Sequence, residues 1–167
     1  RVSHMNPRWN EPSDEAEYLS RFHKAIEMVG AEFMERLDFS AAAWWPARQL
    51  VQDAVDKRFE VDSSGEIMSL GQGGCPWKEH LLKLEEEQKI EPTIKFVLYT
   101  DPMGKWRVQC VPVDLGSFQN RVSLLKEWCG IRDEELSKLS GIPGCIFVHA
   151  GGFIGGNTTY EGVLEMA

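Results

Sequence analysis

The first third of the chain carries the apolar pattern of helices. Apolar residues recur every three or four positions over Leu19–Leu37, which predicts one helix over about 14–39. Pro46 suits the first turn of a second helix, and the apolar positions of that helix continue to Phe59. We therefore expect a helical lead-in over 1–60, in the form of a helical hairpin.

From residue 61 onward, patterns typical of strands alternate with short helical patterns. The predicted strands are 66–70, 94–100, 106–111 and 145–149. The predicted helices are 76–88, 132–140 and 158–166. The second and third strands form a β-hairpin, and the mostly apolar fourth strand is expected at the centre of a sheet. The fold class is therefore α+β, close to α/β: amino-terminal helices are followed by a mixed sheet flanked by helices over 61–167.

A glycine-rich segment follows the last predicted strand. Four of the eight residues in Ala150–Asn157 are glycine, and a helix is expected to begin near Thr158. A strand that runs through glycines into a helix start can bring backbone N–H groups close to a phosphate. The alternative is a tight connection whose glycines serve only positive φ. His149 is either a phosphate ligand or general acid, or a buried, hydrogen-bonded histidine.

Charge narrows the ligand class. The 167 residues carry a formal charge of −8, which argues against the basic surface of a typical nucleic-acid-binding protein. The charge is uneven, because residues 1–93 hold 11 Lys/Arg and 18 Asp/Glu, whereas 94–167 hold 7 and 8. An anionic ligand is therefore expected to meet the second half. The candidate cations near the glycines are Arg107, Arg121 and Arg132.

The sequence does not predict a metal centre, a membrane span or a catalytic group. The four cysteines are well separated, and no histidine motif has metal-binding spacing. The longest strongly apolar run, Ala41–Trp45, is far shorter than the ~20 residues that cross a bilayer. From the residues alone, the chain is a domain with a candidate phosphate loop and no catalytic machinery.

Five blocks of the sequence have a composition specific enough to compare with known families: Asn6–Asn10, Gly74–Leu81, Trp106–Pro112, Arg132–Leu136 and Gly141–Asn157. Together they resemble the melanocyte-proliferating-gene (Myg) exonuclease family. This family is similar to the DHH phosphoesterases, which are two-domain enzymes. The resemblance implies a metal-dependent 3'-to-5' exoribonuclease of the nucleus or mitochondrion. It also implies that manganese or magnesium is held by an amino-terminal half that is missing here.

The chain itself resembles the carboxyl-terminal, substrate-binding half of such an enzyme. The positions that match the family's substrate motif are His149, Gly152, Gly155, Gly156 and Asn157. Asn157 replaces a histidine of many DHH relatives, and Cys129 stands where an arginine is expected. Arg107 and Arg121 are hypothetical phosphate clamps, and no catalytic or metal-binding residue is expected in this fragment.

The partners implied by the resemblance are single-stranded RNA or oligonucleotide phosphate and the protein's own amino-terminal domain. A second copy of the chain is a further option, and no membrane is expected. Two other functions remain open at this point. One is a non-catalytic interaction module, which would dock through the acidic helical first third. The other is a hydrolase of small phosphorylated ligands.

Overall fold

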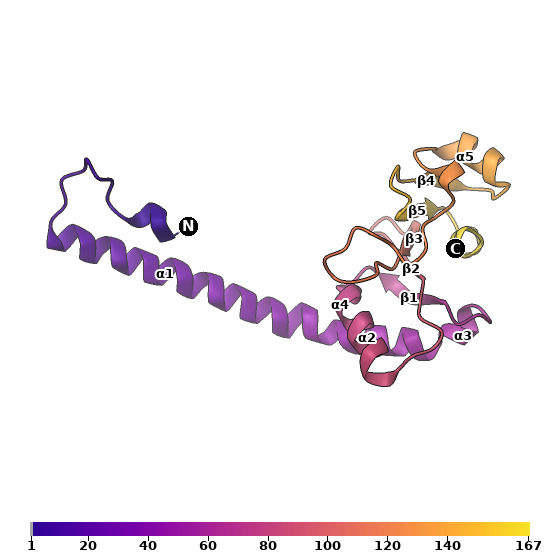
Figure 1. Ribbon diagram of the computed structural model, residues 1–167, viewed down its shortest axis with the longest axis horizontal. Helices are drawn as coiled ribbons and strands as arrows, with labels where there is room; N and C mark the ends of the chain where they lie inside the picture. The colour runs from indigo at the N-terminus through magenta and orange to yellow at the C-terminus, as the bar shows by residue number, and fades with distance from the viewer. Residues whose placement is uncertain (1) are drawn as a thin grey trace. The chain divides into compact units, whose positions relative to one another are not determined.

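The computed structural model describes residues 2–167, and the chain divides into two compact units (Figure 1). The first unit ends at Trp45 and the second covers Pro46–Ala167. The predicted boundary near residue 60 is therefore too late. The reason is that α2 (Trp45–Asp56) buries Val51 and Val55 in a core of the second unit.

The first unit consists of a short 3-10 helix, η1 (Val2–Met5), a loop and the long helix α1 (Glu15–Phe39). The predicted helix over 14–39 is confirmed. Asp14 caps it, because its carboxylate accepts a hydrogen bond from the backbone N–H of Glu17 at 2.8 Å. Such a cap satisfies one of the donors that every helix start leaves open.

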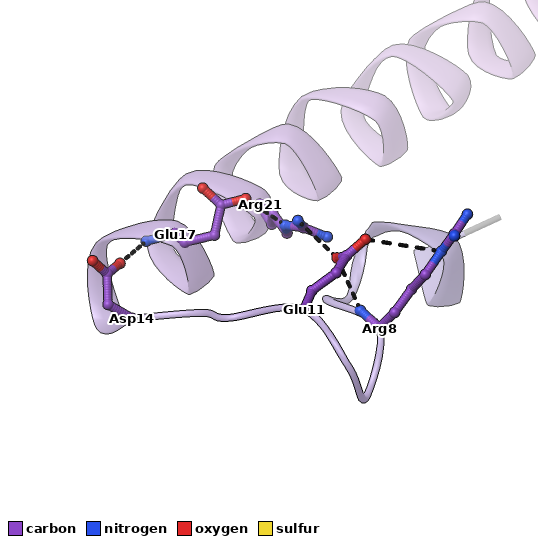
Figure 2. A network of polar contacts seen from close by, with 5 residues as sticks. All are labelled: Arg8, Glu11, Asp14, Glu17 and Arg21. Atoms are coloured by element: carbon purple, nitrogen blue, oxygen red, sulfur yellow. Dashed lines mark hydrogen bonds and ion pairs between the residues drawn. The ribbon is translucent and has the colours of Figure 1, made fainter.

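A charged network joins the loop to the start of α1 (Figure 2). Glu11 accepts a hydrogen bond from the backbone N–H of Arg8 at 3.0 Å. The guanidinium of Arg21 donates to Glu11 at 3.2 Å and to Glu17 at 2.6 Å. The backbone hydrogen bond and the two cations together lower the pKa of the Glu11 carboxyl, although partial burial opposes them. The loop is thus held by one carboxylate and one arginine.

The apolar positions of α1 face solvent. They are Leu19, Phe22, Ile26, Val29, Phe33 and Leu37, and their exposed fractions run from 50% for Val29 to 64% for Phe33. None of the residues of α1 is buried. The spacing of three or four positions between apolar residues therefore identified the helix correctly. It did not reveal that this apolar stripe, formed by the six residues above, is exposed within this unit.

Helical residues continue from α1 through a π-helical segment, Ser40–Trp44, into α2. The backbone N–H of Trp45 donates to the carbonyl of Ser40, which is the wider spacing of a π-turn. Between Glu15 and Asp56 no turn interrupts the helical residues, so the predicted helical hairpin is wrong. The short helix α3 (Arg58–Val61) follows.

The second unit is built on a five-stranded mixed sheet in the order β1-β2-β3-β5-β4. Its strands are β1 (Ile67–Gly73), β2 (Phe96–Thr100), β3 (Trp106–Cys110), β4 (Cys145–Val148) and β5 (Ile154–Asn157). β1 and β2 are parallel and all other pairs are antiparallel. The β2–β3 hairpin is confirmed. The 145–149 strand is not central, because β4 is the last strand of the sheet.

Helices cover the two faces of the sheet unequally. Four further helices are present among the described residues of this unit: α4 (Trp77–Gln88), η3 (Lys126–Trp128), α5 (Asp133–Ser140) and α6 (Tyr160–Met166). One core packs α2 and α4 against β1 and β2, through side chains such as Leu81 and Val97. The other core packs α5 and α6 under β3, β4 and β5, through Leu136 and Val163.

The α+β prediction is confirmed by this arrangement of helices and mixed sheet. Gly141, in the left-handed region at φ 78°, ends α5, and Thr159 caps α6. Within residues 2–167, no helix combines the length and the apolar character needed to cross a bilayer.

Candidate functional site

The glycine-rich segment forms a β-hairpin instead of a strand–loop–helix connection. β4 runs into a turn over 149–153, and the chain returns as β5. The predicted loop over 150–157 is therefore wrong for its second half. Because β5 pairs with both β3 and β4, the backbone of Gly155 and Gly156 belongs to the sheet and does not form a phosphate cradle ahead of α6.

The two glycines of β5 make room on opposite faces of the sheet. A Cβ on Gly155 would lie 2.9 Å from Met166 Cε and 3.0 Å from Leu124 Cδ1, in the core under the sheet. A Cβ on Gly156 would lie 2.7 Å from Arg107 Nη1 and 3.2 Å from Phe147 Cε1, on the other face. Gly155 thus serves packing, and Gly156 lets an arginine lie flat on the sheet.

That second face is uncovered over β3, β4 and β5, and we call it the open face. It is formed by Arg107, Gln109, Phe147, Ile154 and Gly156, which the strand registers place on one side of the sheet. The first four of these residues are only half-buried. The helices α5 and α6 pack on the opposite side, so the open face is accessible to a ligand within this unit.

Two arginines meet one aromatic ring on the open face. The guanidinium carbon of Arg107 lies 5.3 Å from the ring centroid of Phe147, and that of Arg132 lies 5.9 Å from the same centroid. Arg132 is 68% exposed and its nearest carboxylate, on Asp133, is 3.9 Å away. A planar cation on a ring keeps its edge donors for a carboxylate or a phosphate.

Asp101 holds Arg107 in place. The carboxylate accepts one hydrogen bond from Arg107 Nη2 at 2.5 Å and others from the backbone N–H groups of Met103 and Lys105 at 2.9 Å. These contacts, led by that from Lys105, lower the pKa of Asp101 below its ordinary value of 3.8. The carboxylate therefore stays charged above that pH, and the anchoring of Arg107 is lost only on acidification below it.

A cavity of about 400 Å³ opens beside Arg107. Its walls include Gly73, Tyr99, Asp101 and Ile154. Partial burial raises the pKa of the Tyr99 phenol, and its hydroxyl donates to Gln109 Oε1 at 2.8 Å. The cavity lies over the open face and is large enough for a phosphate group with its sugar.

His149 and Gly152 lie in the hairpin turn. The backbone N–H of Gly151 donates to His149 Nδ1 at 3.0 Å, so Nδ1 is an acceptor and the neutral ring carries its hydrogen on Nε2. The imidazole is exposed and offers that N–H to a ligand. Gly152 has a φ of 65°, and a Cβ there would lie 3.1 Å from Cys129 Sγ. Gly152 is thus required by the turn itself.

Asn157 is a buried structural residue in this fold. Its side chain is 0% exposed, and Nδ2 donates to the carbonyl of Pro143 at 2.9 Å. Its Oδ1 accepts from the backbone N–H of Thr159 at 3.0 Å. A Cβ on Gly162 would lie 2.3 Å from the amide, so α6 packs directly on it. Asn157 lies on the side of the sheet opposite the open face.

Arg121 is occupied by a buried ion pair. Its two terminal nitrogens donate to the two oxygens of Glu85 at 2.8 and 2.6 Å, and Nη1 also donates to the carbonyl of Ile94. The side chains of Arg121 and Glu85 are only 17% and 7% exposed. The structure thus brings together Arg107, Arg132 and Gly156. Arg107 is also paired with a carboxylate and is 17% exposed, like Arg121, but it lines a cavity. Arg121 and Asn157 are held in internal contacts.

The described residues do not fit a divalent metal. Across residues 2–167, no three His, Cys, Asp or Glu side chains are grouped closely enough to hold an ion. We therefore assign no metal-dependent step to this chain. Three members of the open face, Gln109, Phe147 and Ile154, were not among the candidate site residues. Phe147 was missed because it lies within an apolar strand that was expected to be buried.

Comparison with known proteins identifies the family. The family model described as "Uncharacterised protein family (UPF0160)", for MYG1 exonucleases, matches residues 1–167. The chain is 56% identical to the MYG1 exonuclease of Bos taurus and 53% identical to that of Homo sapiens, over 167 residues in each case. It is 51% identical to the MYG1 protein of Dictyostelium discoideum over 167 residues.

These alignments cover all of the present chain but 43%, 44% and 50% of the three relatives. The chain thus spans about half the length of the curated relatives that it matches. No solved structure matches it. The family that the sequence blocks suggested is confirmed, and the chain belongs to the MYG1 exonuclease family.

Proposed function

We propose that this chain is the substrate-binding part of a metal-dependent 3'-to-5' exoribonuclease. The second unit would bind the phosphates of a single-stranded RNA end on the open face. The observation that carries the proposal is the pair of guanidinium groups, of Arg107 and Arg132, against the ring of Phe147. Two of the relatives above are named exonucleases, which supports a nucleic acid as the substrate.

The geometry of the open face supports binding and positioning of a phosphodiester, with no bond-breaking step carried out by residues of this chain. Arg107 is fixed by Asp101, so its direction is set before a ligand arrives, which lowers the entropic cost of binding. Arg132 is exposed and can close on a phosphate. Holding a phosphodiester in one orientation is a large part of phosphoryl-transfer catalysis. The metal and the attacking water would then come from outside the described residues.

The first experiment measures binding by this chain. A labelled short single-stranded RNA is titrated with the wild-type chain, with Arg132→Gln and with Arg107→Gln, and fluorescence anisotropy is read at several salt concentrations. A hydrogen bond to a charged group contributes about 1.5–3 kcal/mol, so each variant should weaken binding by roughly tenfold or more. The slope of log affinity against log salt should fall by about 0.7 per lost phosphate contact.

Lys138→Gln is the matched control. Lys138 belongs to α5 in the same unit, is 79% exposed and forms only a 3.7 Å surface pair with Glu134. The substitution removes one positive charge, as the arginine variants do, but at a position away from Phe147. The affinity for RNA should therefore change by less than about twofold. If Lys138→Gln weakens binding as much as Arg132→Gln, RNA is attracted by general charge and the proposed site is wrong.

The second experiment measures activity. The chain alone, with added manganese, should not degrade RNA, whereas the full-length protein should release nucleotides from the 3' end. Arg132→Gln in the full-length protein should reduce kcat/KM by roughly the factor lost in binding. Robust metal-dependent degradation by the 167-residue chain itself would refute the division of roles proposed here.

A further inference from the structure

A second cavity lies beside the open face, and we call it the aromatic cavity. Its volume is about 570 Å³, and it lies among the end of β3, the 112–120 loop and the turn of the β4–β5 hairpin. The residues used below are Lys78, Gln109, Phe118, Asn120, His149 and Phe153. Its size falls within the range of pockets that hold small organic ligands.

The walls of the aromatic cavity select against cations. None of the described residues that line it is Asp or Glu, although the chain carries 26 acidic residues. Apart from the buried thiol of Cys110, its ionisable side chains are those of Lys78 and His149. In a chain with a net charge of −8, such a lining favours an anionic ligand or a neutral part of one.

Two phenylalanine rings give the cavity an affinity for flat ligands. Phe118 is fully exposed, at 102% of its reference surface, and Phe153 is 37% exposed. The ring of Phe153 lies 4.6 Å from that of His149, centroid to centroid, at 57°. An exposed aromatic ring on a loop gains from being covered by another flat ring, and stacking requires no particular base sequence.

The polar groups of the cavity match the edge of a nucleobase. Gln109 Oε1 accepts from the Tyr99 hydroxyl, so its Nε2 is the end that can donate to a ligand. Asn120 Nδ2 donates to Ser123 Oγ at 3.0 Å, so its Oδ1 is the end that can accept. His149 adds the Nε2 donor. The edge of a base pairs with hydrogen-bond donors and acceptors, and the cavity lining contains both.

The two ligand regions are about one nucleotide apart. Gln109 and Arg107 lie on the same face of β3, two residues apart, which is about 7 Å along a strand. Ile154, which is the register partner of Gln109, also lines the cavity beside Arg107. A phosphate at Arg107 would therefore place its own base, or that of its neighbour, at the aromatic cavity.

We infer that the aromatic cavity binds one nucleobase of the RNA end, with Phe118 stacking on the base. The inference rests on the proposed function, because it takes the phosphates to lie on the open face. It assigns Phe118 and Phe153 to base contact and Gln109 and Asn120 to the base edge. The site would accept any base through stacking, as an exonuclease substrate requires.

The test compares two probes on the 167-residue chain. The first is the labelled single-stranded RNA, and the second is an abasic ribose-phosphate oligomer of equal length and charge. Phe118→Ala should weaken RNA binding by about five- to 150-fold, which is the range for loss of one stacked base. Binding of the abasic oligomer should change by less than about twofold. Phe118→Trp should retain RNA binding, because the indole also stacks.

Two controls separate folding from contact. Phe118 is fully exposed, so its replacement should leave the urea unfolding curve unchanged. Leu139→Ala removes another exposed apolar side chain of the same unit, at 51% exposure, and should affect neither probe. Equal loss for both probes in Phe118→Ala would overturn the inference, since Phe118 would then contact the backbone or shape the loop.

The outcomes also distinguish the two proposals. If Phe118→Ala binds RNA normally while Arg107→Gln and Arg132→Gln weaken it, the base site is wrong and the phosphate site stands. If the arginine variants bind both probes normally, the proposed function itself is wrong. If Phe118→Ala weakens RNA alone and the arginine variants weaken both probes, both proposals are supported.

Discussion

Gly155 and Gly156 are adjacent in β5, and exchanging each for alanine should have opposite consequences. In Gly156→Ala the new Cβ would lie 2.7 Å from Arg107 Nη1, where an ordinary contact needs about 3.5 Å or more. The shortest contact is with the end of a flexible side chain, so the guanidinium would move by about 1 Å and lose its 2.9 Å bond to the carbonyl of Trp106. The Phe147 ring and the carbonyl oxygen of Trp106 would each lie 3.2 Å from the new Cβ and would need to shift by only a few tenths of an ångström. The strand itself would survive.

The magnitudes follow from those contacts. A phosphate that depends on Arg107 should lose about 1.5–3 kcal/mol, or roughly ten- to 150-fold in affinity. The free energy of unfolding of Gly156→Ala should change by less than about 1 kcal/mol, because removing a glycine from a strand gains some stability. In Gly155→Ala the Cβ meets Met166, Leu124 and the carbonyl of Phe147 at 2.9–3.2 Å. That overpacking should cost about 1–3 kcal/mol.

The assay is a pair of measurements on each variant. Urea unfolding followed by circular dichroism gives the free energy of unfolding. Fluorescence anisotropy with the labelled RNA gives the affinity in the absence of urea, where both variants are folded. Gly156→Ala should lose affinity and keep stability, and Gly155→Ala should do the reverse. The reasoning is refuted if Gly156→Ala binds RNA normally, or if it destabilises the fold as much as Gly155→Ala.

Three further predictions concern buried groups. Asn157→Ala should lower the free energy of unfolding by about 2–4 kcal/mol, since it removes the bonds to Pro143 and Thr159, and a loss of RNA affinity without a loss of stability would instead place Asn157 at the substrate. Glu85→Gln should cost about 3–5 kcal/mol by urea unfolding, because the buried cation of Arg121 loses its partner; adding Arg121→Met should restore part of that loss, and a purely additive double variant would contradict the account. Burial raises the pKa of the Cys110 thiol to about 11, so Cys110 should resist iodoacetamide at pH 8 in the folded chain and react in urea, as mass spectrometry can show; rapid labelling of the folded chain would mean that the thiol is accessible.

The sequence predicted the elements whose signals are local. The β2–β3 hairpin was readable because β-branched and aromatic residues flank the Asp101–Gly104 turn, and α5 because Gly141 ends it. The start of α6 near Thr158 was likewise readable, because threonine is a common helix cap. Each of these depends on contacts between residues close in the chain, so no knowledge of the tertiary fold was needed.

The rest could not be predicted because distant residues decide it. Ile154–Asn157 contains two glycines and has weak strand propensity, yet it is a strand because β3 and β4 pair with it on both sides. Arg121 looked available as a phosphate clamp, and only the fold shows that Glu85, 36 positions away, already binds it. The apolar stripe of α1 has the spacing typical of a buried helix face, yet none of the residues of α1 is buried within its unit.

The glycines of β5 have a different role in the fold from the one that the sequence predicted. In a phosphate loop a glycine brings the backbone N–H groups to the ligand, whereas here those groups belong to the sheet and the missing side chain at Gly156 is what matters. The space left by Gly156 accommodates the side chain of Arg107, whose guanidinium donates a hydrogen bond to Asp101 and lies against the ring of Phe147. An acidic chain can then provide a binding site for an anion. The guanidinium of Arg107 is held against the ring of Phe147, and the carboxylate of Asp101 beside it already accepts hydrogen bonds from backbone N–H groups. The motif that the sequence displays as glycine-rich therefore acts, in the proposed function, through the arginine that it accommodates.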